Sequence, residues 1–243
     1  MTNRAVSETG DPLLLTPGPL TTSASVKQAM VHDWGSRDQG FIAINKMVLT
    51  KIVELAGAQG THVTVPVQGS GTFAVEAMIT SFVPKTGKLL VVINGAYGQR
   101  AKKIAEIAGR AVATYETPED TPPDLAKLEA MLVADPAITH VFAVHCETTS
   151  GILNPIGEIA ALVKKQGRRL LVDSMSAFGA IEIVEAGLRN LRYGGLAPDL
   201  ADDIAELAHE RTSGILRAGP AGAAGFAGMM RASTSSRGPK SAT

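Results

Sequence analysis

The sequence has very little cysteine and few aromatic residues. It contains one cysteine, Cys146, and one tryptophan among 243 residues. A single cysteine excludes an intrachain disulfide and a metal site built from several cysteines. The five histidines are scattered, and no two of them have the H-x-x-x-H spacing of a helical zinc site. We therefore expect no metal ion in this protein.

An excess of charge of one sign and long apolar runs are also missing. Lys plus Arg total 23 and Asp plus Glu total 23, so the net charge is zero. This balance argues against nucleic acid or a membrane surface as the main partner. The N-terminal stretch MTNRAVSETGDP is polar and has no apolar signal core, and no apolar run approaches the roughly 20 residues that span a bilayer. We expect a globular, cytoplasmic protein.

What the sequence does contain is a regular alternation of strand and helix patterns. Apolar strands are expected at 61–68, 88–94, 110–117, 139–147 and 168–174, and helices near 23–35 and at 41–57, 71–83, 97–109, 124–134 and 156–167. Such alternation predicts an α/β fold, with a mostly parallel sheet and helices on both faces. Ligands of these sheets bind outside the carboxyl ends of the strands, which makes the strand ends the place to search.

The stretch from Gln68 to Thr72 joins an expected strand to an expected helix. Its glycines allow close approach of the backbone, and the free amides at a helix start favour an anion such as phosphate. Ser70 and Thr72 add two hydroxyl groups. The spacing matches neither G-x-G-x-x-G nor the P-loop pattern, so an ordinary glycine-rich helix cap is the alternative interpretation.

Polar residues also follow three later strands, and the most informative is Asp173. The other two groups are Asn94, Gly95 and Tyr97, and then His145, Glu147, Thr148, Thr149 and Ser150. An ionised aspartate beside apolar strands costs on the order of several kcal/mol unless it is paired. A backbone amide cluster or a cationic ring nitrogen would pair with it. A phosphate site and a lone carboxylate at one sheet edge together fit pyridoxal phosphate, which also requires a lysine.

Seven segments, in order, resemble a known family. They are LLLTPGPLTTSASVKQAM, DWGSRD, VPVQGSGTFAVEAM, NGAYGQR, ETPEDTPPD, HCETTSGILNP and VDSMSAFGA. Over about residues 13–183 the chain resembles the 2-aminoethylphosphonate–pyruvate transaminases, a class V, fold-type-I family of pyridoxal-phosphate aminotransferases. The resemblance implies amino transfer from 2-aminoethylphosphonate to pyruvate, which gives phosphonoacetaldehyde and alanine. It also implies a homodimer with the site at its interface.

The resemblance assigns roles to individual residues of this sequence. Ser70, Gly71 and Thr72 correspond to the loop that holds the cofactor phosphate. Thr148 or Thr149 corresponds to the residue near the ring hydroxyl, and Asp173 corresponds to the partner of the pyridine nitrogen. Substrate-side groups correspond to Trp34, Ser36 and Arg37.

The sequence departs from the family after about residue 183. The Schiff-base lysine of the family is expected a few tens of residues after Asp173, but no lysine occurs between Lys165 and Lys240. The sequence therefore offers no catalytic residue, and we expect residues 184–243 to form a divergent tail rich in Ala, Gly and Arg, unpacked over 219–243. A truncated or frameshifted gene would produce such a tail, and a natural tail with its own role is the alternative.

The chain is thus expected to consist of an arm at 1–12, a large-domain segment at 13–183 and the tail. Three functional hypotheses follow for the chain as a whole. The chain is an aminotransferase, or a truncated remnant that binds the cofactor without covalent attachment, or an unrelated doubly wound nucleotide-binding protein. An acidic residue about 20 residues after a G-x-G-x-x-G motif would favour the last, and the sequence has none. The missing lysine separates the first two hypotheses and predicts that this chain does not transaminate.

Overall fold

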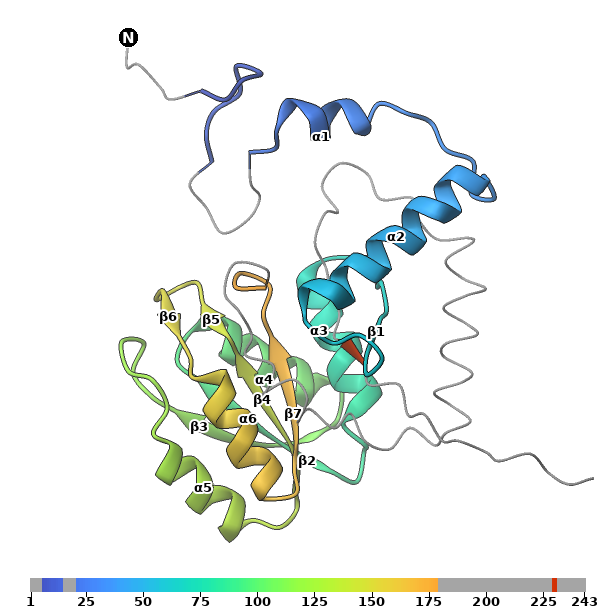
Figure 1. The fold of residues 1–243 in the computed structure, drawn as a ribbon. Helices are drawn as coiled ribbons and strands as arrows, with labels where there is room; N and C mark the ends of the chain where they lie inside the picture. Colours follow the sequence, from blue (N-terminus) through green and yellow to red (C-terminus); the bar gives the residue numbers. More distant parts are fainter. Residues whose placement is uncertain (1–5, 15–20, 179–228, 231–243) are drawn as a thin grey trace, which may run out of the picture.

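The computed structural model describes residues 6–14, 21–178 and 229–230 (Figure 1). Its main body is a four-stranded sheet with the order β3 (Ala111–Glu116), β2 (Lys88–Ile93), β4 (Ile138–Val144) and β7 (Arg169–Asp173). All neighbouring strands in this sheet are parallel. The predicted α/β class with a mostly parallel sheet is confirmed.

Two pairs of helices cover the two faces of this sheet. The helices α3 (Gly71–Phe82) and α4 (Ala96–Ile107) pack on one face, and α5 (Leu125–Ala134) and α6 (Ile156–Lys165) pack on the other (Figure 1). Within the described residues, no helix is both long and apolar enough to cross a bilayer. The sandwich explains why the strands read as continuous apolar runs, since both of their faces are buried.

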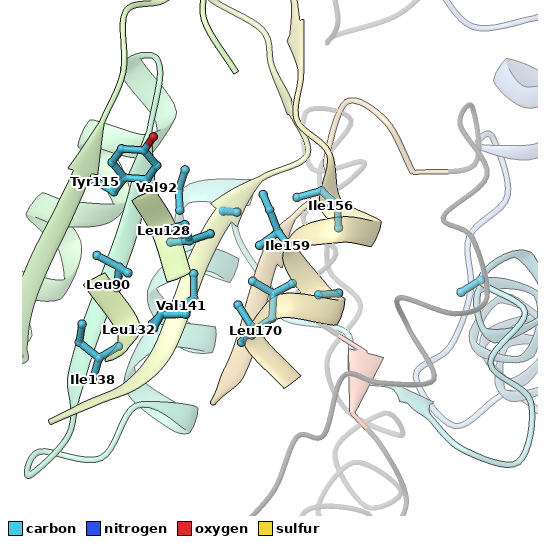
Figure 2. Close-up of a cluster of buried hydrophobic side chains, with 14 of the residues drawn as sticks. Leu90, Val92, Tyr115, Leu128, Leu132, Ile138, Val141, Ile156, Ile159 and Leu170 are labelled. Carbon is cyan, nitrogen blue, oxygen red and sulfur yellow. The ribbon is translucent and has the colours of Figure 1, made fainter. Parts of the chain in front are cut away.

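Successive side chains of β2 alternate between the two faces, as the pleat of a strand requires. Leu90 and Val92 belong to the apolar cluster under α5 and α6, whereas Leu89 and Val91 belong to the cluster under α3 and α4. Figure 2 shows the first cluster, in which side chains from all four strands meet those of the two helices: Leu90, Val92, Tyr115, Val141, Leu170, Leu128, Leu132, Ile156 and Ile159. The two packed faces hold the carboxyl ends of the strands at fixed positions.

The strand order creates a switch point between β2 and β4. From β2 the chain crosses to β3 on one side, and it then returns to β4 on the other side of β2. The crossovers that leave this point diverge, which opens the space outside the carboxyl ends of the strands to a ligand. We call the residues at and just after the ends of β2, β4 and β7, at 94–98, 145–150 and 173–176, the carboxyl edge of the sheet.

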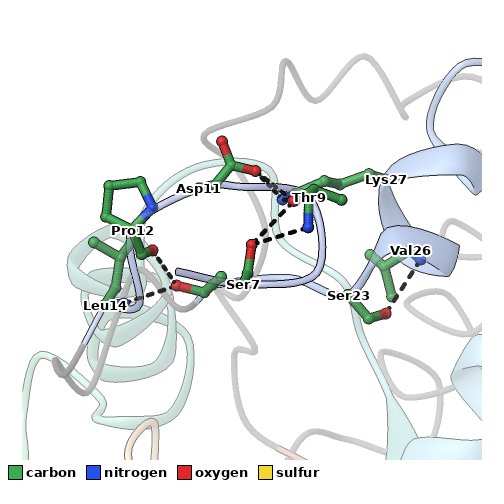
Figure 3. A network of polar contacts seen from close by, with 9 residues as sticks. Ser7, Thr9, Asp11, Pro12, Leu14, Ser23, Val26 and Lys27 are labelled. Carbon is green, nitrogen blue, oxygen red and sulfur yellow. Dashed lines mark hydrogen bonds and ion pairs between the residues drawn. The ribbon is translucent and has the colours of Figure 1, made fainter. Parts of the chain in front are cut away.

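The helix α1 (Ala24–Ala29) and the start of α2 (Gln39–Leu55) lie apart from the sheet in Figure 1, whereas Val53 near the end of α2 packs against the first apolar cluster. Each begins at a residue whose side chain accepts a backbone N–H bond, Ser23 for α1 and Asp38 for α2. The preceding segment is tied to α1 because Lys27 binds Asp11 and Thr9, as Figure 3 shows. These contacts are exposed, and exposed ion pairs contribute about 1 kcal/mol or less.

Two of the predicted strands differ from the structure. The run at 61–68 forms only the two-residue strand β1 (Val63–Thr64), which pairs with β8 (Met229–Met230) and not with the main sheet. Pro66 has no N–H for a sheet ladder, which limits the strand on its carboxyl side. The run at 139–147 is divided, since Cys146–Glu147 (β5) pair antiparallel with Ile152–Leu153 (β6). Apart from β8, the expected tail at 184–243 lies outside the described residues.

Candidate functional site

Asp173 ends β7 at the carboxyl edge and is partly buried. Its Oδ1 accepts one hydrogen bond, at 3.2 Å from the N–H of Met175. Burial raises the pKa of Asp173 above its usual value, the Met175 N–H and the charge of Arg100 oppose this, and the charge of Glu147 adds to it. Among the described residues no salt bridge reaches this carboxyl group. It is therefore suited to a cationic partner.

The start of α3 offers free backbone donors near the same edge. The Oγ of Ser70 accepts the N–H of Phe73 at 3.2 Å and caps the helix. The N–H groups of Gly71 and Thr72 have no acceptor in the part of the chain that the structure describes, as is usual for a first helical turn. A Cβ built on Gly71 would meet no atom within 4 Å. The space beside Gly71 is therefore open, and Thr72 is exposed.

Arg100 links the start of α3 to the carboxyl edge. Its Nη1 donates to the Oγ1 of Thr72 at 3.2 Å, and its guanidinium carbon lies 4.7 Å from the centre of the Tyr97 ring. The charge of Arg100 also lowers the pKa of Asp173. The structure thus brings Thr72 and Asp173 into one electrostatic environment, with an arginine that the sequence analysis did not single out.

The two candidate threonines lie in the turn between β5 and β6, and they have different surroundings. Thr149 is engaged, because its Oγ1 accepts the N–H of Ala96 at 3.2 Å and donates to Glu147 at 2.9 Å. Thr148 is partly buried, and its hydroxyl has no hydrogen-bond partner among the described residues. Of the two, Thr148 is the one whose hydroxyl is available to a ligand.

His145 fastens the ends of β4 and β7 to each other. Its backbone N–H donates to the backbone carbonyl of Asp173 at 2.8 Å, and its ring Nδ1 lies 2.9 Å from the Oγ of Ser174. Burial lowers the pKa of His145, which favours the neutral imidazole. Next to it, Asn94 and Asn154 form a buried pair of amides joined by two hydrogen bonds of 2.7 and 3.2 Å. These contacts fix the backbone that carries Asp173.

The comparisons with known proteins agree with this geometry. Residues 22–186 match the family model described as Aminotransferase class-V. The chain belongs to the class-V aminotransferase family. This excludes the hypothesis of an unrelated nucleotide-binding protein and confirms the family that the seven sequence segments indicated.

Curated relatives and solved structures in this family are similar to much of the chain. A 2-aminoethylphosphonate–pyruvate transaminase of Pseudomonas putida (strain GB-1) is 53% identical over 71% of this chain and 47% of its own length. One from Cupriavidus necator is 56% identical over 71% of this chain and 46% of its own length. The pyridoxamine–pyruvate aminotransferase of Mesorhizobium loti has a TM-score of 0.68 at 27% identity, covering 75% of this chain and 46% of that structure. The chain spans under half the length of these relatives.

Within this class-V aminotransferase chain, the predicted substrate-side residues lie away from the carboxyl edge. Trp34, Ser36 and Arg37 belong to the segment between α1 and α2, which lies apart from the sheet in Figure 1. Trp34 stacks on Phe41 with a centroid distance of 6.3 Å. In the described ranges no hydrogen bond or ion pair joins these residues to the carboxyl edge, and their role stays a prediction.

Three lysines of the described chain pair with acidic residues other than Asp173. Lys88 starts β2 and pairs with Asp135, and Lys165 ends α6, so both lie at the amino edge of the sheet. Lys102 pairs with Glu116. Among the described residues, no lysine forms a salt bridge with Asp173.

Proposed function

We propose that this chain is the cofactor-binding part of a pyridoxal-phosphate aminotransferase that acts on 2-aminoethylphosphonate and pyruvate. The observation that carries the proposal is the pairing of an open helix start at Gly71 and Thr72 with an unpaired, partly buried Asp173, linked through Arg100. The names of the relatives from Pseudomonas and Cupriavidus support the same substrates.

The residues at the edge fit the chemical groups of pyridoxal phosphate. The amides of Gly71 and Thr72, with the hydroxyls of Ser70 and Thr72, suit the phosphate. Asp173 suits a protonated ring nitrogen, because a neighbouring cation offsets the burial that raises the pKa of this carboxyl group. The available hydroxyl of Thr148 suits the ring hydroxyl. When bound, the cofactor supplies an electron sink for the carbon that carries the amino group.

The side chains of this chain then have limited tasks in the reaction. Asp173 would hold a proton on the ring nitrogen, and His145 with Ser174 would keep the end of β7 in place. No lysine occurs from 166 to 239 to provide a covalent attachment or a proton shuttle. We therefore propose that the chain by itself binds the cofactor only non-covalently. The remnant that cannot transaminate is thus retained as the second candidate function.

The first test replaces the ring-nitrogen partner without changing its shape. Asp173→Asn is expected to weaken binding of pyridoxal phosphate by about tenfold or more, since a hydrogen bond to a charged group is worth about 1.5–3 kcal/mol. Fluorescence titration with the cofactor measures the effect. Asp135→Asn is the matched control, because Asp135 pairs with Lys88 at the opposite edge of the sheet. Equal affinities for the wild type and Asp173→Asn would exclude this role for Asp173.

We also propose a cytoplasmic homodimer, as the family resemblance implies. The helices α1 and α2 and the segment between them expose large apolar side chains that a second subunit would cover: Val26, Met30, Val31, Ile42, Ile44, Met47 and Val48. Exposed apolar patches are typical of protein–protein interfaces, and these side chains are the candidates for one. Sedimentation equilibrium is expected to give twice the chain mass of 25.2 kDa. A Met47→Glu variant should shift the mass toward one chain, and a single-chain mass for the wild type would contradict the dimer.

A further inference from the structure

The start of α4 is the place in this fold where an anionic ligand is expected. It follows β2 at the switch point of the sheet, where ligands of parallel α/β sheets bind. The positive end of the helix dipole and the free N–H groups of the first turn favour an anion there. The residue that begins the helix is Gly95, which has no side chain to cap it.

In this protein the anion at the start of α4 is a side chain of the protein itself. The carboxylate of Glu147 is 0% exposed. It accepts the N–H of Tyr97 at 3.2 and 3.3 Å and the N–H of Gly98 at 3.3 Å. The hydroxyl of Thr149 donates to it at 2.9 Å. No lysine or arginine of the described residues forms a salt bridge with it, so the helix start is its counter-charge.

The backbone at the helix start is shaped for this carboxylate. A Cβ built on Gly95 would lie 2.1 Å from the Cγ and 2.4 Å from the Cδ of Glu147. Any side chain larger than hydrogen at position 95 would therefore displace Glu147 from the amides. The fit is specific, because a Cβ on Gly71 at the start of α3 meets nothing within 4 Å.

We propose that Glu147 is a positioning residue, a built-in anion that fills the start of α4 and leaves the start of α3 as the place for a phosphate group. The two helix starts lie near the same edge, and Arg100 on α4 reaches Thr72 on α3. Without Glu147, a phosphate would have two competing sites. With it, the phosphate is directed to α3, and Tyr97 and the turn of Thr148 are fixed against each other.

The inference rests on the proposed cofactor site only for the identity of the phosphate compound, so its test uses inorganic phosphate. In wild-type protein, amide NMR during a phosphate titration should shift Gly71 and Thr72 but not Tyr97 and Gly98. In Glu147→Gln, which keeps the shape and removes the charge, the amides of Tyr97 and Gly98 should respond as well. Removal of the Glu147 charge is expected to raise the affinity of the start of α4 for phosphate by up to about tenfold.

Two further variants separate the charge from its surroundings. Thr149→Val keeps the carboxylate and is the matched control, so its Tyr97 and Gly98 amides should stay unresponsive to phosphate. Glu147→Ala leaves room at the helix start, and formate should raise its thermal midpoint more than chloride at equal ionic strength. This rise in the thermal midpoint is measurable even if the variant without formate is too unstable for NMR titration.

The outcomes distinguish this inference from the proposed function. The role of Glu147 would be overturned if phosphate did not shift the Tyr97 and Gly98 amides in Glu147→Gln. It would also be overturned if formate raised the thermal midpoint of Glu147→Ala no more than chloride does. A different result is that phosphate shifts the Tyr97 and Gly98 amides in Glu147→Gln but does not shift the Gly71 and Thr72 amides in the wild type. This result would support the role of Glu147 and contradict only the phosphate site at α3.

Discussion

The purified chain is expected to form alanine from 2-aminoethylphosphonate and pyruvate at least about 10²–10⁴ times more slowly than a full-length relative, the factor typical for loss of a general acid–base. The reason is the absence of lysine from 166 to 239. In this chemistry a lysine holds the cofactor covalently, exchanges with the substrate amine and moves the proton. Loss of the covalent attachment lowers the rate further.

Three lysines of the described chain are paired with acidic residues other than Asp173. Lys88 and Lys165 lie at the amino edge of the sheet, and Lys102 is paired with Glu116. In the proposed function Asp173 and the start of α3 still bind the cofactor, so binding and turnover should separate. A chain that binds pyridoxal phosphate but does not turn over is the pattern that we expect.

Borohydride reduction with added cofactor, followed by peptide mapping, tests this directly. In this chain no single lysine should carry the reduced adduct. In the parallel control, the transaminase of Pseudomonas putida should carry it at one lysine. Alanine formation is followed in the same samples. A single modified lysine together with alanine formation would show that another lysine has taken over, and the interpretation of residues 166–239 would be wrong.

Most of the sheet could be predicted from the sequence, because strands buried on both faces leave a strong apolar signal. The run predicted at 88–94 is β2 (Lys88–Ile93), and the run at 168–174 is β7 (Arg169–Asp173). Asp173 is predicted as a site residue because a carboxylate ends such a run. The expected strand at 61–68 failed since alternation alone does not show which partner a strand has, and β1 pairs outside the main sheet.

The internal contacts of the site could not be predicted in the same way. Glu147 stood out as polar, yet its partners at Tyr97 and Gly98 are 50 and 49 residues away in the chain. Local patterns do not show which distant amide a carboxylate meets. One signal was present, since Gly95 begins a helix without a capping side chain, and an uncapped start calls for an acceptor from elsewhere.

A second large effect is expected far from the site, at His140 in the middle of the sheet. His140 is 1% exposed, and in the strand register it pairs with Leu89 of β2 and Arg169 of β7. Its Nδ1 contacts the Oγ1 of Thr139 at 2.8 Å, whereas its Nε2 has no hydrogen-bond partner within the described part of the chain. Burial, and to a lesser degree the charge of Arg169, lower the pKa of His140 from 6.5 to about 4.

The sign of the resulting pH dependence follows from proton binding. The unfolded chain takes up a proton on His140 below pH 6.5, and the folded chain does so only near pH 4. The unfolded state therefore binds more protons in this window, and the free energy of unfolding falls as the pH falls from about 6.5 to about 4. At about pH 5 the loss from this group amounts to about 2 kcal/mol, from 1.36 kcal/mol per unit of pKa shift.

Urea denaturation of the wild type and of His140→Leu at about pH 7.5 and about pH 5 isolates this contribution. The wild type should lose about 2 kcal/mol more than the variant between the two pH values. The comparison cancels the other groups, since the lowered pKa of His145 acts in the same direction and the raised pKa of Asp173 in the opposite one in both proteins. NMR titration of the His140 ring gives an independent reading. A ring that titrates near its ordinary value of 6.5, or parallel losses of stability in the two proteins, would mean that the imidazolium is accommodated in the sheet.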